Sequence, residues 1–393
     1  MTDSASTNEG LGQRHWMTAP ATAAVFDALE AEGGPDCARF VGGCVRNALV
    51  GRPIDDLDIA TTLTPERVTR ALKAASIRPV PTGIDHGTVT AVSNHVPHEI
   101  TTLRRDVSTD GRRATVAFTD DWCEDAQRRD FTLNALYARR DGSIFDPTGH
   151  GVADARAGRI VFVGEPEKRL DEDPRRNLRF FRFHARFGKG APDDAAVAAC
   201  AKLKDRIDDL AAERISKELL KLLAADDPRA AMRLMAETGV LDVVLKVPAN
   251  LARFEALVEV EADQLFECDP VLRLAALAPT PVLKSWMSPR EIRREVYRSG
   301  VAAFRDRAKL AWAASPRTAT TMQWRGMIAL AEGWSPPVLP LTGQEIINAG
   351  VPKGPLVGQV MREVEDWWID HDFLDDKLSV IEKLKAVAQG LAY

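Results

Sequence analysis

The pattern of hydrophobic and polar positions divides the chain into a mixed first part and a helical remainder. Residues 21–33 carry apolar side chains at helical spacing and run into Gly33-Gly34-Pro35, which predicts a helix that stops there. Residues 38–41 favour a short strand, residues 45–49 a short helix, and residues 57–60 a second strand. This order predicts a turn at Gly42-Gly43 between the first strand and the short helix.

Further elements continue this alternation and then give way to helices. Thr64-Pro65-Glu66 predicts a helix start, with Thr as the N-cap and Pro in the first turn. Residues 87–92, 99–103 and 159–163 favour strands. Beyond about residue 170, almost every segment has an apolar period near 3.6. The predicted fold class is therefore an α+β head with a mixed sheet and flanking helices, followed by an all-α remainder.

One stretch interrupts the helical remainder. Residues 341–355 are rich in Gly and Pro, and the pattern predicts loop structure there. It would join a helical body to a C-terminal tail, with a plain linker between helices as the alternative.

Composition places the chain among ordinary soluble globular proteins. Of its 393 residues, 45% are hydrophobic and 28% charged, and no apolar run is long enough for a membrane span. The first ten residues lack the basic and apolar regions of a signal peptide. Five cysteines form no metal-binding spacing, so we expect a cytoplasmic protein.

Charge is polarised along the sequence, although the net charge is only −5. Residues 175–192 contain six basic residues and no acidic one, whereas residues 361–380 contain seven acidic residues and two basic ones. The first stretch is suited to binding an anion.

The carboxylates Asp56 and Asp58 are the strongest chemical signal. They flank one residue of the predicted strand, so both side chains would lie on the same face, where a divalent cation relieves their repulsion. Gly42 and Gly43 upstream would let backbone amides approach a phosphate. Together these features predict phosphoryl or nucleotidyl transfer. Glu99 could be a third catalytic carboxylate, or a surface residue of an edge strand.

Two basic clusters lie downstream. Arg128 and Arg129 could clamp triphosphate oxygens, or they could be a solvated helix end. In the second cluster, acidic and basic residues recur every three positions and would form one helical stripe that reads the edge of a nucleobase. The alternative is an N-cap at Asp173 followed by solvated arginines. The members of this stripe are Asp173, Arg176, Arg179 and Arg182. Residues 213–223 predict an amphipathic helix.

Taken in order, these clusters resemble the class II nucleotidyltransferase family, which includes bacterial CCA-adding enzymes and bacterial poly(A) polymerases. The resemblance rests on VGGCVRNALVGRPIDDLDIATT, EITTLRRD, RRDFTLNALY, FDPTGHGVADARAGRIVFVGEPEKRLDEDPRRNLRFFRF and ERISKELLKLL, and the later TGQEIINAGVPKGPLVGQV is similar to the family's tail entry. Relative to the family, Asn47 replaces the usual Asp.

The resemblance implies a site and a domain order. Asp56 and Asp58 would bind Mg²⁺. Gly42, Gly43, Arg46 and Arg128 or Arg129 would contact the nucleotide phosphates. Asp173 and Arg176 would select CTP or ATP, with Arg179 and Arg182 completing the pocket. The implied order is a flexible N-terminus (1–20), a nucleotidyltransferase head (21–148), a base-recognising neck (149–225), a helical body (226–340) and a helical tail (341–393).

The implied reaction adds C, C and A to the tRNA 3′ end from CTP and ATP without a template and releases pyrophosphate. A poly(A) polymerase or single-base-adding relative shares these motifs, although the acidic C-terminal segment favours CCA addition. An inactive RNA-binding scaffold is the alternative of another class, and Asp56 and Asp58 argue against it. The resemblance implies no membrane and names no protein partner.

Overall fold

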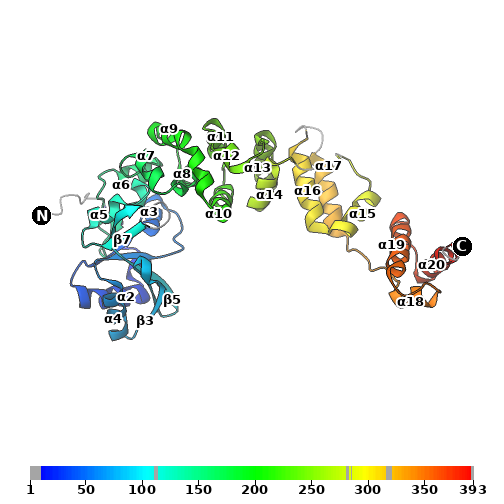
Figure 1. Ribbon diagram of the computed structural model, residues 1–393, viewed down its shortest axis with the longest axis horizontal. Coiled ribbons are helices and arrows are strands. Elements are labelled where there is room, and N and C mark those ends of the chain that lie inside the picture. Colours follow the sequence, from blue (N-terminus) through cyan, green and yellow to red (C-terminus); the bar gives the residue numbers. More distant parts are fainter. Residues whose placement is uncertain (1–9, 110–113, 280–282, 285, 316–320, 391–393) are drawn as a thin grey trace. The chain divides into compact units, whose positions relative to one another are not determined.

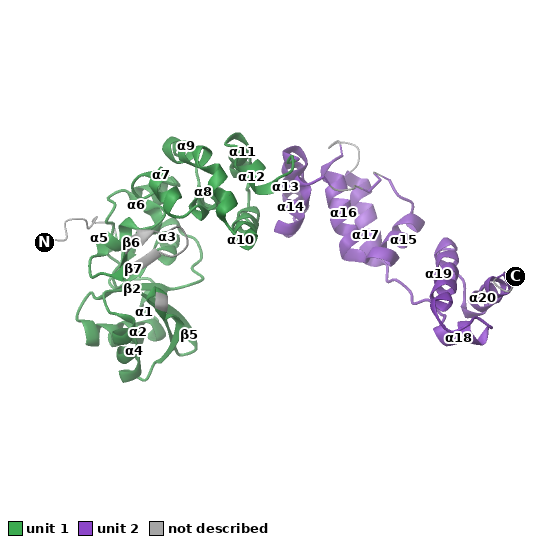
Figure 2. Ribbon diagram, viewed as in Figure 1, with its two compact units in different colours: residues 1–249 green, residues 250–393 purple. Residues whose placement is uncertain are grey.

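The computed structural model describes residues 10–109, 114–279, 283–284, 286–315 and 321–390. The chain forms two compact units, residues 1–249 and residues 250–393 (Figure 2). The finer division into head, neck, body and tail stays a prediction. Within the segment predicted to be a flexible N-terminus, residues 1–9 lie outside the described residues, while Leu11 and Met17 are buried.

The head of the first unit is built on a mixed seven-stranded sheet (Figure 1). Its strand order is β3-β4-β5-β2-β1-β8-β9, and only the β2–β5 pair is parallel. The strands are β1 (Ala38–Val41), β2 (Asp58–Thr61), β3 (Arg78–Gly83), β4 (Thr88–Ser93), β5 (Val96–Thr102), β8 (Tyr137–Ala138) and β9 (Ile144–Phe145). A separate hairpin consists of β6 (Arg104–Thr109) and β7 (Ala114–Phe118).

Helices α2 and α4 pack against each other and against the sheet. The head helices are α1 (His15–Thr18), α2 (Pro20–Gly33), α3 (Gly43–Val50), α4 (Pro65–Ala74) and α5 (Trp122–Gln127), with 3₁₀ turns η1 (Ile84–His86) and η2 (Thr132–Asn134). Helix α4 begins as predicted, because the Thr64 side chain accepts the Arg67 N–H and Pro65 follows it. Phe26, Phe40 and Ile59 are fully buried and fix the β1–β2 centre of the sheet against α2.

Helices follow the head to the end of the first unit. They are α6 (Gly151–Ala157), α7 (Pro166–Glu172), α8 (Arg175–Phe187), α9 (Asp194–Lys202), α10 (Ala212–Leu223), α11 (Arg229–Glu237) and α12 (Val240–Leu245), with the 3₁₀ turn η3 (Lys204–Asp209). Helix α10 confirms the predicted amphipathic helix, with Leu219, Leu222 and Leu223 buried. It packs against α8, which joins this helical part to the head through aromatic contacts.

The strand predicted at residues 159–163 is wrong. Only Phe162 forms a bridge there, with Phe131. Its ring lies 4.9 Å from that of Phe131 and 6.0 Å from that of Phe180 on α8. Gly158 and Gly164, both at positive φ, turn the chain on either side. The apolar run therefore fills an aromatic cluster between head and α8 and does not extend the sheet.

The described residues of the second unit form helices and the segments that connect them, as the 3.6 period predicted. Its helices are α13 (Leu251–Gln264), α14 (Pro270–Leu277), α15 (Pro289–Ser299), α16 (Val301–Ala313), α17 (Thr321–Gly333), α18 (Gly343–Asn348), α19 (Pro355–Asp370) and α20 (Lys377–Gly390). Phe304 and Trp324 are fully buried in one cluster formed mainly by α15–α17. Val360, Val364 and Val380 belong to a second cluster formed mainly by α18–α20.

The loop predicted at residues 341–355 contains a helix. Helix α18 begins with a reciprocal capping box between Thr342 and Glu345, a pattern that fixes a helix start even beside glycine. Leu341, Ile346 and Val351 are buried in the second cluster. The segment is therefore part of the folded C-terminal core and not a plain linker.

Three of the seven acids in the acidic C-terminal stretch pair with α15 inside the second unit. Arg293 of α15 binds Asp372, Arg298 binds Asp366 at 2.9 Å, and Arg294 binds Asp370. Part of its negative charge is therefore compensated by a neighbouring helix. Across the described parts of the chain, none of the helices combines the length and apolar character needed to cross a membrane.

Candidate active site

Carboxylates from two parallel strands meet at one end of the β2–β5 pair. Asp58 begins β2, and the register places it opposite Glu99 of β5. The Glu99 N–H donates to the Leu57 carbonyl at 3.3 Å. Asp56 lies in the segment just before β2, so the expectation that both aspartates share the strand is wrong for Asp56, because the ladder begins only at Leu57 and Asp58.

The three carboxylates concentrate negative charge around Asp58. Burial raises the pKa of Asp58 to about 6, with further contributions from the charges of Glu99 and Asp56. Arg129 acts in the opposite direction. A bound cation would offset the negative charges of Glu99 and Asp56 and so favour the charged form of Asp58.

A divalent metal at this site would need ligands that the protein does not supply. Within the described residues, no three His, Cys, Asp or Glu side chains form a group able to hold a metal ion by themselves. Mg²⁺ is commonly held by one or two carboxylates together with substrate phosphates, and it retains several water ligands. Asp56 and Asp58 match this mode, in which the substrate supplies the remaining oxygens.

The glycine pair forms the turn into α3. Gly42 has φ 69°, a conformation that strongly favours glycine. A Cβ at Gly42 would stand 3.6 Å from Nη1 of Arg129, so the turn and this guanidinium approach closely. Gly42 donates its own N–H to the Leu136 carbonyl at 3.0 Å. The amides suited to an anion therefore begin at Gly43, the first residue of α3.

A buried aspartate that the sequence analysis missed holds both arginines of the first basic cluster. Oδ1 of Asp125 accepts from Nη2 of Arg128 at 2.7 Å, and Oδ2 accepts from Nη2 of Arg129 at 2.9 Å. The Tyr137 hydroxyl donates to Oδ2 at 2.7 Å. The spacing i, i+3 and i, i+4 was the sequence signal for this set. Arg128 and Arg129 are therefore a fixed pair and not a solvated helix end.

Charge pairing dominates the electrostatics of this clamp. Burial alone would raise the pKa of Asp125, but Arg129 and Arg128 hold it well below its usual range. The pKa of Arg129 lies above its usual range despite burial, because Tyr137 and Asp125 favour its charged form. Arg129 thus keeps its full charge beside the Gly42 turn and near Asp58.

Asp130 and Asn134 link the head to α8. Oδ2 of Asp130 accepts from Nε of Arg179 at 2.8 Å, and Oδ1 accepts from Nδ2 of Asn134 at 3.0 Å. Oδ1 of Asn134 in turn accepts from Nη1 of Arg46. Arg46 and Arg179, which lie far apart in the sequence, therefore belong to one hydrogen-bonded network.

The predicted base-reading stripe is only partly helical. Asp173 lies in extended backbone before Pro174, and α8 begins at Arg175. Asp173 is therefore not on the helix, because proline disfavours helical geometry in the residue before it. Its carboxylate accepts from both Nε and Nη2 of Arg175, at 2.9 and 2.7 Å respectively. Burial opposes this charge, but Arg175 keeps the pKa of Asp173 below its usual value.

The other two arginines of the stripe also have protein partners. Arg176 donates to Glu172 at 2.6 Å and to the Arg128 carbonyl at 2.9 Å. Arg182 pairs with Glu218 of α10 at 2.6 Å. The arginines are thus oriented by the fold, although Glu172 and Glu218 were not singled out in the sequence.

Asn47 has a specific role at the position of the family aspartate. Its Oδ1 accepts from Nη2 of Arg46 at 2.8 Å, and its Nδ2 donates to the Pro53 carbonyl at 2.7 Å. A carboxylate could not make the second bond, because it has no N–H. Asn47 therefore ties α3 to the segment that leads into Asp56.

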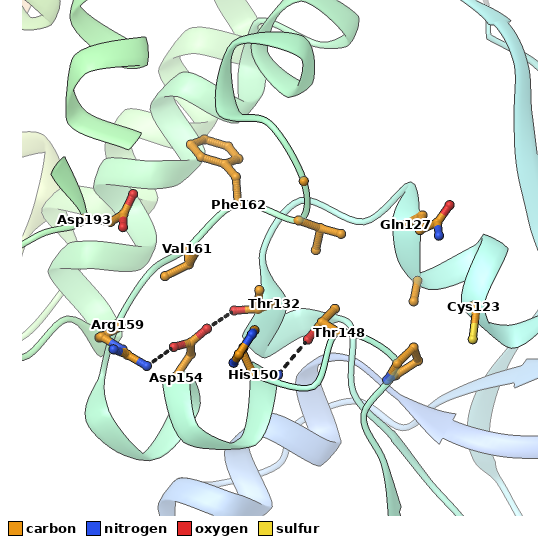
Figure 3. Close-up of a pocket in the computed structure, with 14 residues that line it drawn as sticks. Cys123, Gln127, Thr132, Thr148, His150, Asp154, Arg159, Val161, Phe162 and Asp193 are labelled. Atoms are coloured by element: carbon orange, nitrogen blue, oxygen red, sulfur yellow. Dashed lines mark hydrogen bonds and ion pairs between the residues drawn. The ribbon is translucent and has the colours of Figure 1, made fainter. Parts of the chain in front are cut away.

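One cavity in the first unit lies away from these residues (Figure 3). It measures about 520 Å³ and is lined by residues of α5, α6 and the segment 161–164. Asp154 in its wall accepts from Thr132 at 2.7 Å and pairs with Arg159 at 2.7 Å. Its lining includes none of the site residues predicted from the sequence. This cavity is therefore not the candidate site, which is defined by its carboxylates and arginines.

Comparisons with known proteins match this arrangement. Residues 38–161 match a family model described as the poly A polymerase head domain, and residues 191–251 match one described as a probable RNA and SrmB-binding site of polymerase A. CCA tRNA nucleotidyltransferase 1, mitochondrial, of Mus musculus is 32% identical over 378 residues, covering 88% of this chain and 86% of the mouse protein.

The chain belongs to the CCA tRNA nucleotidyltransferase family.

Bacterial members of the family are similarly close. The CCA-adding enzyme of Lacticaseibacillus paracasei is 32% identical, over 84% of this chain and 87% of that enzyme. The crystal structure of the Bacillus stearothermophilus CCA-adding enzyme in complex with CTP is 26% identical, with a TM-score of 0.69 over 95% of this chain and 98% of that one. The predicted α+β head with a helical remainder is confirmed.

Family membership confirms the resemblance found in the sequence and places the chain among nucleotidyltransferase enzymes. Enzymes of this type use a divalent metal, which matches the carboxylates at the end of β2 and β5.

Proposed function

We propose that this protein is a Mg²⁺-dependent enzyme that adds C, C and A to the 3′ end of tRNA from CTP and ATP. The observation that carries the proposal is the meeting of Asp58, Glu99 and Arg129 beside the Gly42 turn, in a chain related to CCA-adding enzymes over most of its length. The structure of the Bacillus stearothermophilus enzyme in complex with CTP supports a nucleotide substrate for this chain. A cytoplasmic location fits the free, buried thiols of its cysteines, which include Cys37, Cys44 and Cys200.

The residues divide into a metal end and a phosphate end. Asp56 and Asp58 would hold Mg²⁺, with Glu99 adding negative charge beside them. When bound, the metal ions would lower the pKa of the attacking hydroxyl and neutralise negative charge on the triphosphate. Gly43 and Arg129 face the same place from the α3 turn and the Asp125 clamp, and they would bind phosphate oxygens.

The chain itself orients the reactants. The Asp125 clamp fixes Arg128 and Arg129, so their donors need no rearrangement when charge builds on the departing pyrophosphate. Arg46, anchored by Asn134 and Asn47, would steady the turn and the phosphates. Arg179 and Arg182 would complete the pocket along α8.

The proposed function is tested with a tRNA transcript that lacks its 3′ CCA. In the presence of Mg²⁺, CTP alone should add only C, ATP alone should add little or nothing, and both nucleotides together should add CCA. EDTA should abolish addition, and excess Mg²⁺ should restore it. Long adenosine tails with ATP would identify a poly(A) polymerase instead, and absence of any product would contradict the proposal.

Base choice should depend on Asp173. We expect Asp173→Ala to reduce discrimination between CTP and ATP by roughly ten- to a hundredfold, the range of one bidentate base contact. Phosphate binding should change little, since the clamp arginines remain. The measurement is kcat/KM for each nucleotide on tRNA ending before C and before A.

A nearby exposed acid provides the control for this variant. Asp171→Ala removes a carboxylate two positions away that pairs with Arg206, and base choice should stay unchanged. If Asp173→Ala left base selectivity unaltered, Asp173 would have no part in base choice. Its role would then be to stabilise the start of α8, where its carboxylate accepts the Arg175 N–H.

A further inference from the structure

Four basic side chains gather around one aromatic ring at the end of α8. The guanidinium carbons of Arg46, Arg52 and Arg186 lie 4.1, 4.9 and 5.8 Å from the centre of the Phe187 ring. Lys189 lines a small cavity with Arg46, Arg52 and Phe187. We call these five residues the Phe187 cluster. It takes up the last two basic residues of the stretch 175–192, which the proposed active site does not use.

The Phe187 cluster differs from the rest of α8 in its charge balance. Arg175, Arg176, Arg179 and Arg182 each pair with a carboxylate. By contrast, no ion pair with any described residue is formed by the four cations of the cluster. Positive charges held together without counter-charges repel, and a bound anion offsets that repulsion.

The side chains that accept hydrogen bonds from Arg46 carry no charge. Asn134 accepts from Nη1 of Arg46, and Asn47 accepts from Nε and Nη2 at 3.1 and 2.8 Å, but both are amides and supply no counter-charge. Burial lowers the pKa of Arg46 to about 10. The charge of Asp130 raises this pKa, whereas the charges of Arg186 and Arg182 lower it further. Arg186 and Lys189 are exposed, so an anion can reach the cluster from solvent.

We propose that the Phe187 cluster binds phosphate groups of the RNA backbone. Guanidinium groups suit phosphate because their donors form a planar fork, and stacking on Phe187 holds them in place. This inference rests on the proposed function only for the identity of the RNA as tRNA.

Position favours the RNA backbone over the incoming nucleotide. Arg52 follows the C-terminal end of α3, while Gly43 begins that helix about 10 Å away at 1.5 Å per residue. Phe187 ends α8, about 18 Å along the helix from Arg175, next to Asp173. Arg46 lies between the two regions, since a Cβ at Gly43 would stand 3.9 Å from its Nη2. A polymer repeats its phosphate charge and can reach from the carboxylates past Arg46 to Arg52, Arg186 and Lys189, which lie beyond the reach of one nucleotide at the carboxylates.

The test uses the full chain with Arg52, Arg186 and Lys189 all changed to alanine, leaving Arg46 in place. Binding of a tRNA transcript lacking CCA is followed by fluorescence anisotropy over a series of KCl concentrations, without nucleotide. We expect the slope of log K against log salt to become shallower by about 2, at about 0.7 per lost contact to a single strand. Affinity at about 0.1 M salt should fall roughly a hundredfold.

A charge-matched control removes three paired cations from the same unit. Lys202, Arg206 and Lys246 pair with Glu167, Asp171 and Asp208, and changing all three to alanine should leave the slope unchanged. Equal loss of slope in both triple variants would overturn the proposal. Thermal melting checks the fold, and the double variant Arg186→Ala/Lys189→Ala, which changes only exposed side chains, tests the same idea with a slope change of about 1.4.

Steady-state kinetics separate the RNA from the nucleotide. In the triple cluster variant, KM for tRNA should rise while KM for CTP and ATP stays constant. A rise in KM for CTP with unchanged tRNA binding would assign the cluster to the nucleotide and overturn the proposal. Because the anisotropy assay needs no catalysis, a wild-type protein that binds RNA through the cluster but adds no nucleotide would contradict the proposed function alone.

Discussion

Replacing Asp58 by alanine should lower nucleotide addition at least roughly a thousandfold, because metal ions supply several kcal/mol of transition-state stabilisation. Asp58 is the half-buried member of the carboxylate group and begins β2 opposite Glu99. Asp56→Ala should also lower the rate of nucleotide addition. The measurement is single-turnover incorporation of CMP into tRNA lacking CCA at saturating Mg²⁺.

The controls for this prediction separate chemistry from binding. Asp55→Ala removes an exposed carboxylate next to Asp56 and should leave the rate nearly unchanged. Anisotropy should show tRNA binding largely intact in Asp56→Ala and Asp58→Ala. If either variant lost tRNA binding as strongly as activity, the metal-binding role of that residue would be wrong.

Replacing Asp125 by asparagine should lower the free energy of unfolding by about 3–5 kcal/mol, because two mostly buried guanidiniums lose their shared counter-charge. KM for CTP and for ATP should rise together, since the freed arginines no longer hold the triphosphate in place. Urea denaturation and nucleotide kinetics measure the two effects. The contribution of Asp125 should persist at neutral pH, because its pKa lies below that of an unfolded aspartate and its charge is lost only in strong acid.

Tyr137→Phe is the matched control within the same clamp. It removes only the hydroxyl, which donates to Oδ2 of Asp125 and accepts from Nε of Arg129 at 3.2 Å, and it should cost about 1 kcal/mol. Base choice should change little in both variants, because Arg176 is bound to the backbone carbonyl of Arg128 and not to the clamp side chains. A denaturation midpoint for Asp125→Asn equal to that of the wild type would show that the arginines do not depend on this residue.

Local signals in the sequence were enough for several elements. The Thr64-Pro65 start of α4, the β1 strand before the glycine turn and the amphipathic α10 depend on capping, chain reversal and periodicity, which act over a few residues. The apolar run at 159–163 was ambiguous, since the same composition serves a strand or an aromatic cluster. For residues 341–355 the loop prediction was wrong, because it relied on the glycines and prolines and did not take account of the capping box at Thr342.

The sequence by itself determined the α+β order, the acidic pair Asp56 and Asp58, and the family, because motif spacing and period are properties of neighbouring residues. Only the tertiary structure decided which charges meet: Glu99 beside Asp58, and Asp125 between Arg128 and Arg129. It also separated the paired arginines of α8 from the unpaired cations around Phe187. The physical reason is that ion pairing depends on distances of a few ångströms, which strand register and helix packing set between residues far apart in the chain.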